Sequence, residues 1–486
     1  MAINVGLADI LLVSPMIALF IASLIPITVK ILRKNEEQPA IATLIQGLAG
    51  IFVAFILLIM VSGSGTTAFA NTLVFDGVTT WMGVIALASG AGSLVLMYEN
   101  PSTTGDQFSE LVFLALSSLT GMLILCSAVD LLTVFIGLET MSLALYLMIG
   151  MSHEQRLSKE AAMKYFILGS FASAIFLYGV AMLFGSAGST FIPNIIAKTG
   201  ELISTSRMFV FGITLVTLGF CFKVSIVPFH AWTPDVYQGA PTPHSAFMAT
   251  AVKTVSFAAF LRIIASRSLV GSENLFDFLQ WIAVITMIVG NVAAILQNNF
   301  KRMLAYSSIA HSGYLLVGII TTGISDKMTF GASGVIFYLL AYSLMTLGAF
   351  AIVSIFEKTE NTALSIDDMA GFAKKRPVTA FCLTIFLLSL AGVPPTVGFF
   401  GKFYLFTSAI GEGLLWLAIW GVLNSVISVY YYLRPIVVMY MRDGEADHAP
   451  ATYSATKIAI VISAILIVVF GLASGPIFSV VEKALL

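Results

Sequence analysis

Long apolar runs, separated by short polar connections, dominate this chain. About 20 helical residues cross a bilayer core about 30 Å thick, and runs of at least that length recur throughout the sequence. They cover residues 7–29, 41–62, 78–98, 108–128, 131–151, 161–184, 207–230, 244–265, 278–297, 302–322, 331–356, 378–410, 414–440 and 458–481. We therefore expect an all-α polytopic membrane protein with about 14 transmembrane helices. A β-barrel is a poor alternative, because its strands would alternate apolar and polar residues.

The composition agrees with a single membrane domain over residues 1–486. Apolar residues make up 58% of the chain and charged residues 10%, against about 45–50% and about 25% in soluble domains. No polar stretch is long enough for a soluble domain. The first run, 7–29, is too long for a signal-peptide core, so we expect it to be retained as a span.

Several classes of function are excluded at this stage. The net charge is −1 and the sequence has no basic run, which argues against a nucleic-acid partner. No glycine-rich phosphate loop follows a predicted strand. Cys126, Cys221 and Cys382 lie far apart in apolar runs, as expected for core thiols. We expect no metal site and no disulfide.

The lysines and arginines of the connections predict the orientation of the chain. Odd-numbered connections hold Lys30, Arg33, Lys34, Arg156, Lys159, Lys301, Arg302, Lys358, Lys374, Lys375, Arg376, Arg442 and Lys457, and even-numbered ones hold Lys198, Arg207, Arg267 and Lys327. Because cytoplasmic loops carry the excess of positive charge, both termini should lie on the non-cytoplasmic side. The longest polar connection, 358–376, is then cytoplasmic.

Two segments should be broken helices. The stretch from Arg207 to Asp235 carries Pro228 and Pro234. The stretch 377–411 also exceeds one span, and it carries Pro394 and Pro395. Proline removes a helical hydrogen bond and clashes with the preceding turn. Irregular backbone at membrane depth is tolerated only where protein or a water-filled cavity covers it.

The breaks fall in the seventh and twelfth predicted helices, five apart. An odd offset reverses the direction of a helix across the bilayer, as in the inverted repeats of transporters. We therefore expect two inverted five-helix repeats, helices 4–8 and 9–13, within residues 101–270 and 275–441. Residues 1–100 would form helices 1–3, and residues 455–486 the final helix.

Ionisable residues lie within these apolar runs. Glu139 is about nine residues into its run, roughly 14 Å deep, and Lys253 and His311 lie at similar depth. Lys223 and Lys402 lie beside the two breaks. Burying a lysine or glutamate at the midplane costs at least about 2.5–3.5 kcal/mol, so a group of such residues predicts a function.

Each of these residues also has a structural interpretation. Lys164 is shallower and could extend its ammonium to the cytoplasmic surface. Lys253 and Lys402 could lie at an interface if the helix boundaries shift, and Glu139 could form a purely structural ion pair. His311 could be a core histidine that bonds a carbonyl.

The turn after the first break carries two further histidines. His230 could be a proton relay or a residue of a hydrated turn. We expect His244 to be solvated.

One carboxylate, several amines and an imidazole permit proton handling rather than covalent catalysis. Desolvation weakens the hold of a lysine on its proton and a nearby carboxylate strengthens it. Moving Glu139 towards or away from Lys223 would therefore switch the lysine between holding and releasing a proton. Moving protons against a membrane potential needs an energy source, and no residue pattern on this chain supplies one.

Four stretches together resemble the antiporter-like subunits of respiratory complex I, the proton-translocating NADH:quinone oxidoreductase. They are FIGLETMSLALYLM (135–148), PFHAWTPDVYQGAPTP (228–243), KRMLAYSSIAHSGYLLVG (301–318) and LAGVPPTVGFFGKFYLF (390–406). The chain is most similar to the subunit N group. It has Lys402 where subunit M carries a glutamate, and it lacks the long lateral helix of subunit L.

The resemblance implies a role for each matching position. Glu139 and Lys223 look like the charge pair that switches during pumping, and Lys253 like the central lysine of helix 8. His311 is similar to the polar link between half-channels, Lys402 to the residue on the exit route, and Lys164 to a helix 6 lysine of less settled role. His244 replaces the small or apolar residue expected after Pro-Thr-Pro, which leaves that histidine without an implied role.

The resemblance also implies the setting of the chain. FMN, iron–sulfur clusters and the quinone site would lie on other subunits, with no cofactor on this chain. The partners would be neighbouring membrane-arm subunits and the lipid of a bacterial inner membrane. The competing function is a subunit of a cation/proton antiporter. A third, an intramembrane enzyme or non-transporting scaffold, does not account for the buried lysines.

Overall fold

The computed structural model describes residues 6–33, 39–63, 65–103, 105, 107–151, 156–264, 273–324, 328–356, 364–444 and 454–485. Four of the residues used above to predict orientation, Lys34, Arg267, Lys327 and Lys358, lie outside these ranges.

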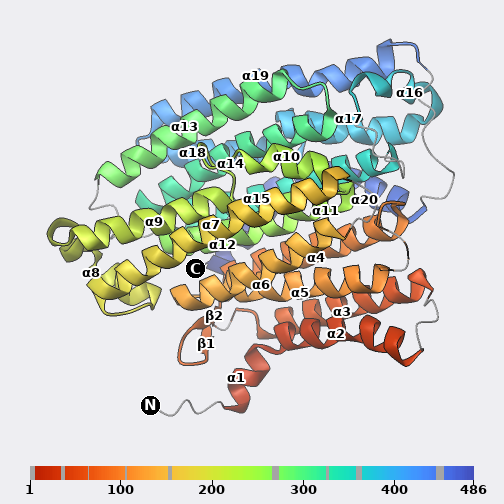
Figure 1. Cartoon of the computed structure of the whole chain (residues 1–486). Coiled ribbons are helices and arrows are strands. Elements are labelled where there is room, and N and C mark those ends of the chain that lie inside the picture. The colour runs from red at the N-terminus through yellow and green to blue at the C-terminus, as the bar shows by residue number, and fades with distance from the viewer. Residues whose placement is uncertain are drawn as a thin grey trace.

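The described chain is almost entirely helical (Figure 1). Its helices are α1 Leu7–Leu12, α2 Ser14–Leu32, α3 Ala40–Val61, α4 Gly77–Glu99, α5 Phe108–Ser127, α6 Leu131–Gly150, α7 Arg156–Ala187, α8 Ile192–Thr205, α9 Arg207–Lys223, α10 Trp232–Gly239, α11 Thr242–Phe247, the π-helical turn Met248–Val252, α12 Lys253–Ile264, α13 Glu273–Ile295, α14 Phe300–Ile324, α15 Met328–Phe356, the 3-10 turn Asp367–Met369, α16 Phe372–Lys375, α17 Pro377–Ala391, α18 Val397–Gly411, α19 Leu415–Met441, α20 Ser454–Leu472 and α21 Ser474–Leu485.

Twelve of the described helical segments are long and apolar enough to cross a membrane. The all-helical membrane fold is therefore confirmed, while the exact number of crossings and the inverted repeat stay predictions. Two predicted spans are each divided by a single residue. Val13 separates α1 from α2, and Ala473 separates α20 from α21.

Both predicted helix breaks are confirmed. In the first, α9 ends at Lys223 and α10 begins at Trp232; in the second, α17 ends at Ala391 and α18 begins at Val397. The backbone of the first break is satisfied by protein. The Ile226 amide donates to the Cys221 carbonyl (2.8 Å), and the Val227 amide to the Thr286 hydroxyl (3.1 Å). Protein partners of this kind allow irregular backbone at membrane depth.

Helix α15 lies in the interior of the bundle (Figure 1) and packs against α4, α11, α14, α17, α18, α20 and α21. The span formed by α11, the π turn and α12 is also almost wholly buried. Arg262 of α12 clamps it to the start of α4, where its guanidinium donates to both carboxylate oxygens of Asp76 at 2.6 and 2.8 Å. These buried helices carry the polar residues described below.

A carboxylate joins the third span to the last long one. Glu99 ends α4, and its two oxygens accept hydrogen bonds from the amides of Ala455 (2.9 Å) and Thr456 (2.7 Å) in the first turn of α20. The first amides of a helix have no partner within it, and its N-terminus favours negative charge. Glu99 therefore anchors the N-terminus of α20.

Two small elements were not predicted from the sequence. Strands β1 (Thr66–Ala68) and β2 (Leu73–Phe75) form an antiparallel hairpin between α3 and α4. Helix α8 lies between α7 and α9, and it buries Ile192, Ile195 and Thr199. Both elements are too short to give a pattern of span length.

Candidate functional site

Glu139 is the ninth residue of α6, which agrees with the depth predicted from the sequence. Its carboxylate accepts a hydrogen bond from the Ser173 hydroxyl of α7. Lys223 is the last residue of α9. Its ammonium donates to the Ser142 hydroxyl of α6 (2.6 Å) and the Tyr165 hydroxyl of α7 (3.3 Å). No ion pair between Glu139 and Lys223 is present in the described structure, so each charge is held by hydroxyl groups.

A small cavity lies beside Lys223 and beside Ser173, the hydroxyl partner of Glu139. Its volume is about 20 Å³, and Ser142, Ser173 and Lys223 supply polar groups to its wall. Gly169 also lines it, opposite Tyr146. A Cβ at residue 169 would stand 2.1 Å from the Tyr146 hydroxyl, so only glycine allows α7 to approach α6 this closely.

The residues predicted to break the first helix fall in different places. Pro228 lies between α9 and α10, whereas Pro234 is the third residue of α10. Proline is tolerated in the first helical turn, because the amides there lack a helical partner. Pro234 therefore lies inside a helix and not in the break. His230 lies in the break and is half-buried, and its Nδ1 has no hydrogen-bond partner among the described residues.

Lys164 lies at the surface, as its structural interpretation expected. Its side chain is 43% exposed and forms ion pairs of 2.9 Å with Glu160 and with Asp235. Asp235 also pairs with Arg302 at 2.7 Å. Burial would raise the pKa of the Asp235 carboxyl, but the hydrogen bonds and charges of Lys164 and Arg302 outweigh burial and hold that pKa below its ordinary value. Lys164, Asp235 and Arg302 thus form a charged cluster where α10 lies beside the start of α14.

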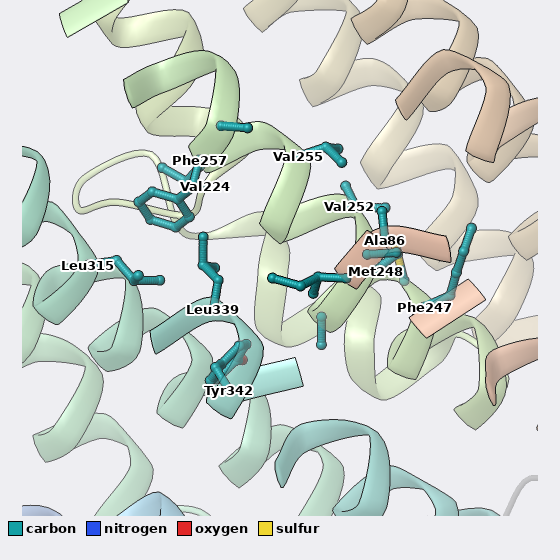
Figure 2. Packing of buried hydrophobic residues seen from close by; sticks show 14 of the residues in the cluster. Ala86, Val224, Phe247, Met248, Val252, Val255, Phe257, Leu315, Leu339 and Tyr342 are labelled. Carbon is teal, nitrogen blue, oxygen red and sulfur yellow. The ribbon is translucent and has the colours of Figure 1, made fainter. Parts of the chain in front are cut away.

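Lys253 opens α12, immediately after the π-helical turn. It is only 4% exposed, so it does not lie at an interface. Its ammonium donates to the main-chain carbonyl (2.5 Å) and the hydroxyl (2.6 Å) of Ser308, and lies 5.1 Å from the ring centre of Tyr342. Figure 2 shows Tyr342 with Met248 and Val252 in the apolar core of this region. The charge is therefore held in a largely apolar setting.

A chain of hydrogen bonds connects the first break to Lys253. The Ser312 hydroxyl of α14 donates to the carbonyl of Val224, the residue after Lys223, at 2.6 Å. It also lies 3.2 Å from the Ser308 carbonyl that accepts from Lys253. A carbonyl cannot donate a proton, so this chain joins the two sites structurally and does not form a continuous proton wire.

His311 lies in the middle of α14 and is 1% exposed. Its Nδ1 is hydrogen-bonded to the Tyr338 hydroxyl, and its Nε2 to the Tyr432 hydroxyl at 3.0 Å. The expected alternative, a core histidine that bonds a carbonyl, does not describe this arrangement. Hydroxyl groups can donate or accept, so either nitrogen can carry the proton.

Lys402 is the sixth residue of α18 and is 4% exposed. Its ammonium donates to the carbonyls of Leu390 (2.9 Å) and Ala391 (3.0 Å) and to the Ser425 hydroxyl (2.9 Å). Both carbonyls end α17, where the last carbonyls of a helix lack a helical partner and carry the negative end of its dipole. Pro394 and Pro395 lie in the same break, between α17 and α18.

Two tyrosine rings lie between the last three groups. The Tyr342 ring centre is 5.1 Å from both the Lys253 ammonium and the His311 ring centre. The Tyr314 ring centre is 5.6 Å from that of His311 and 5.0 Å from the Lys402 ammonium. Such contacts stabilise a cation by about 0.5–2 kcal/mol. Lys253, His311 and Lys402 thus form a connected row.

The sequence interpretation missed these tyrosines and serines. The signal that could have found them is helical spacing, because residues three or four apart share a face. Ser142 follows Glu139 by three positions. Ser308 and Tyr314 lie three positions on either side of His311.

The prediction that His244 is solvated is wrong. Its side chain is 1% exposed, and neither ring nitrogen has a hydrogen-bond partner among the described residues. The reason is that α11 does not lie in a surface turn. It packs against α4, α10 and α15 inside the bundle.

A family model described as NADH:quinone oxidoreductase/Mrp antiporter, TM, matches residues 128–428. NADH-quinone oxidoreductase subunit N of Bdellovibrio bacteriovorus is 71% identical over 486 residues, which cover 100% of both chains. Subunit N of Trichlorobacter lovleyi is 43% identical over 390 residues, 80% of this chain and 79% of that one.

Solved structures share the architecture. A chain of respiratory complex I from Thermus thermophilus with bound Aureothin has a TM-score of 0.82 at 30% identity, covering 96% of this chain and 98% of that one. A chain of the Mrp complex from Dietzia sp. DQ12-45-1b has a TM-score of 0.83 at 18% identity, over 99% and 97%. The second likeness is one of fold alone.

Proposed function

The chain belongs to the subunit N family of NADH-quinone oxidoreductases, and from this premise we propose that its Glu, Lys and His side chains at membrane depth carry protons across the bacterial inner membrane. The observation that carries the proposal is the row of ionisable groups at membrane depth. Glu139, Lys223, Lys253, His311 and Lys402 lie on five different helices of the bundle. Their neighbours are hydroxyl groups, aromatic rings and main-chain carbonyls.

The first part of the row is suited to switching. Lys223 is held by two hydroxyl groups and lies near Glu139 without contacting it. A lysine keeps its proton more firmly when a carboxylate approaches and less firmly when the carboxylate withdraws. Closing and opening this pair would load and unload the amine.

The second part is suited to transfer and storage. His311 has a hydroxyl partner on each ring nitrogen, so it can accept a proton on one side and release one from the other. Lys402 donates to three acceptors at once, which holds its ammonium in one place. We assign the order Lys223, Lys253, His311, Lys402, ending at the second break.

The energy would come from quinone reduction by NADH on other subunits of the complex, where we place FMN, the iron–sulfur clusters and the quinone. Neighbouring membrane-arm subunits would transmit it. We also propose that both termini lie on the non-cytoplasmic side. The charged cluster of Lys164, Asp235 and Arg302 is then on the cytoplasmic side, close to the first break.

The test replaces Lys223 with alanine in the assembled complex and measures NADH:quinone reduction together with proton pumping into vesicles. We expect pumping to fall at least about tenfold, with slower quinone reduction, because the switching amine is gone. The control is Lys198→Ala, which removes a lysine of α8 whose ammonium, among the described residues, bonds the Ala187 carbonyl alone. Normal pumping and normal quinone reduction in Lys223→Ala would overturn the proposal.

A further inference from the structure

We propose that Ser142 and Ser173 are positioning residues that hold Glu139 and Lys223 apart, with one water molecule in the cavity that the two serines and Lys223 line. This inference rests on the proposed function of the pair. It identifies the residues that set the distance between Glu139 and Lys223. That distance decides when the lysine holds its proton.

The two serines bind opposite members of the pair. The Ser173 hydroxyl of α7 donates to the Glu139 carboxylate. The Ser142 hydroxyl of α6 accepts from the Lys223 ammonium at 2.6 Å, while its own proton is donated to the Leu138 carbonyl. Each serine therefore stabilises its charged partner away from the other charge.

Ser142 and Glu139 offer Lys223 two alternative positions. They are three residues apart on α6, so they share a face and lie about 4.5 Å apart along the helix axis. The ammonium would move by about one helical turn between the hydroxyl of one and the carboxylate of the other. Four rotatable bonds give a lysine side chain that reach.

The cavity is large enough for one water molecule. A buried water needs about 10–15 Å³ and two to four polar partners, and this cavity has about 20 Å³. Ser142, Ser173 and Lys223 all line it. The ammonium has three donors and spends two on Ser142 and Tyr165, so the third can point into the cavity.

The remaining wall is mostly apolar and closely packed. Apart from Tyr146, it is lined by Leu138, Ala172, Phe176, Phe222 and two glycines. At one of these, Gly219, a Cβ would stand 2.8 Å from the Phe176 Cβ. A low-polarity wall strengthens each remaining hydrogen bond to a charge. Loss of one serine hydroxyl should therefore shift the balance between the separated and closed pair measurably.

The experiment compares Ser142→Ala, Ser173→Ala, Ser142→Thr and Ser173→Thr in the assembled complex. Proton pumping and quinone reduction are measured for each. A hydrogen bond to a charged group corresponds to a population change of at least about tenfold, so we expect each alanine variant to lower the pumping rate by about tenfold. Each threonine variant keeps the hydroxyl and should restore most of the rate. A role in packing alone would not give this rescue.

Thr140→Ala is the matched control. Thr140 is next to Glu139, but its hydroxyl bonds the Ile136 carbonyl of its own helix, so pumping should be unchanged. Wild-type pumping in both serine-to-alanine variants, beside a failed Lys223→Ala, would overturn the serine assignment and leave the proposed function intact. Equal loss in alanine and threonine variants would overturn it too. Normal pumping in Lys223→Ala would overturn the proposed function itself.

Discussion

The two helix breaks each present a lysine, but they hold it in different ways. At the first break, Lys223 ends α9 and its ammonium bonds the side-chain hydroxyls of Ser142 and Tyr165. At the second, Lys402 lies in the second half-helix, α18, and its ammonium reaches back to the carbonyls of Leu390 and Ala391. One lysine is held mainly by side chains that can rotate, and the other by main chain that cannot.

The different partners of the two lysines suit the two helix breaks to different tasks. A side-chain hydroxyl can release an ammonium by changing rotamer. The Glu139 carboxylate lies near Lys223 and can then bind the ammonium. Backbone carbonyls at a helix end have a fixed direction and favour positive charge. The first break is therefore suited to a mobile charge, and the second to a proton held in one place.

The largest expected effect follows from removing each ammonium. Lys402→Met leaves the buried Leu390 carbonyl without its lysine donor, at about 1–3 kcal/mol for an unsatisfied acceptor, while the Ala391 carbonyl keeps the Ser425 hydroxyl. Lys223→Met costs less, because Ser142 keeps its bond to the Leu138 carbonyl. Thermal denaturation of the purified complex should show a clearly larger loss of stability for Lys402→Met. Equal losses would remove the distinction between the breaks.

A smaller effect is expected from Gly392→Ala at the second break. Gly392 has φ of 89°, and a Cβ there would stand 3.2 Å from the Lys402 Cδ. Left-handed backbone costs a residue with a side chain roughly 1–2 kcal/mol. Gly413→Ala is the control, with φ of 77° and open space around it.

Both glycine variants should lose similar stability in thermal denaturation, but only Gly392→Ala should also lower proton pumping. Normal pumping in Gly392→Ala would show that pumping does not depend on the exact position of the Lys402 side chain.

The smallest effect is expected from exposed ion pairs at the surface. Asp235→Asn removes the carboxylate that pairs with Lys164 and Arg302, and partly exposed pairs contribute about 0–1 kcal/mol each. Asp443→Asn, beyond the end of α17 that is farther from the second break, removes an exposed pair with Lys374 and should give no measurable change in stability. A larger loss for Asp443→Asn than for Asp235→Asn, measured by thermal denaturation, would contradict this ranking.

Much of the fold could be predicted from the sequence, because apolar run length and proline have direct consequences in a bilayer. The breaks beside Lys223 and Lys402 and the depth of Glu139 followed from such counting. Short elements such as the hairpin at Thr66 left no comparable signal.

The candidate site was less predictable, because its contacts join residues far apart in the chain. Ser173 meets Glu139 across 34 positions, and Tyr432 meets His311 across 121. His244 was misplaced for a related reason. A polar residue after two prolines looks like part of a turn, and only the packing of α11 shows that it is buried.

The bond between Glu99 and the start of α20 has a consequence for how the protein is made. The two amides lie 356 and 357 positions after Glu99, so the carboxylate gains them only when almost the whole chain has been synthesised. The third span, α4, is therefore inserted in the membrane before its neighbour α20 has been made. Biogenesis of this subunit should therefore finish in a late step, in which the last long helix docks against one of the first.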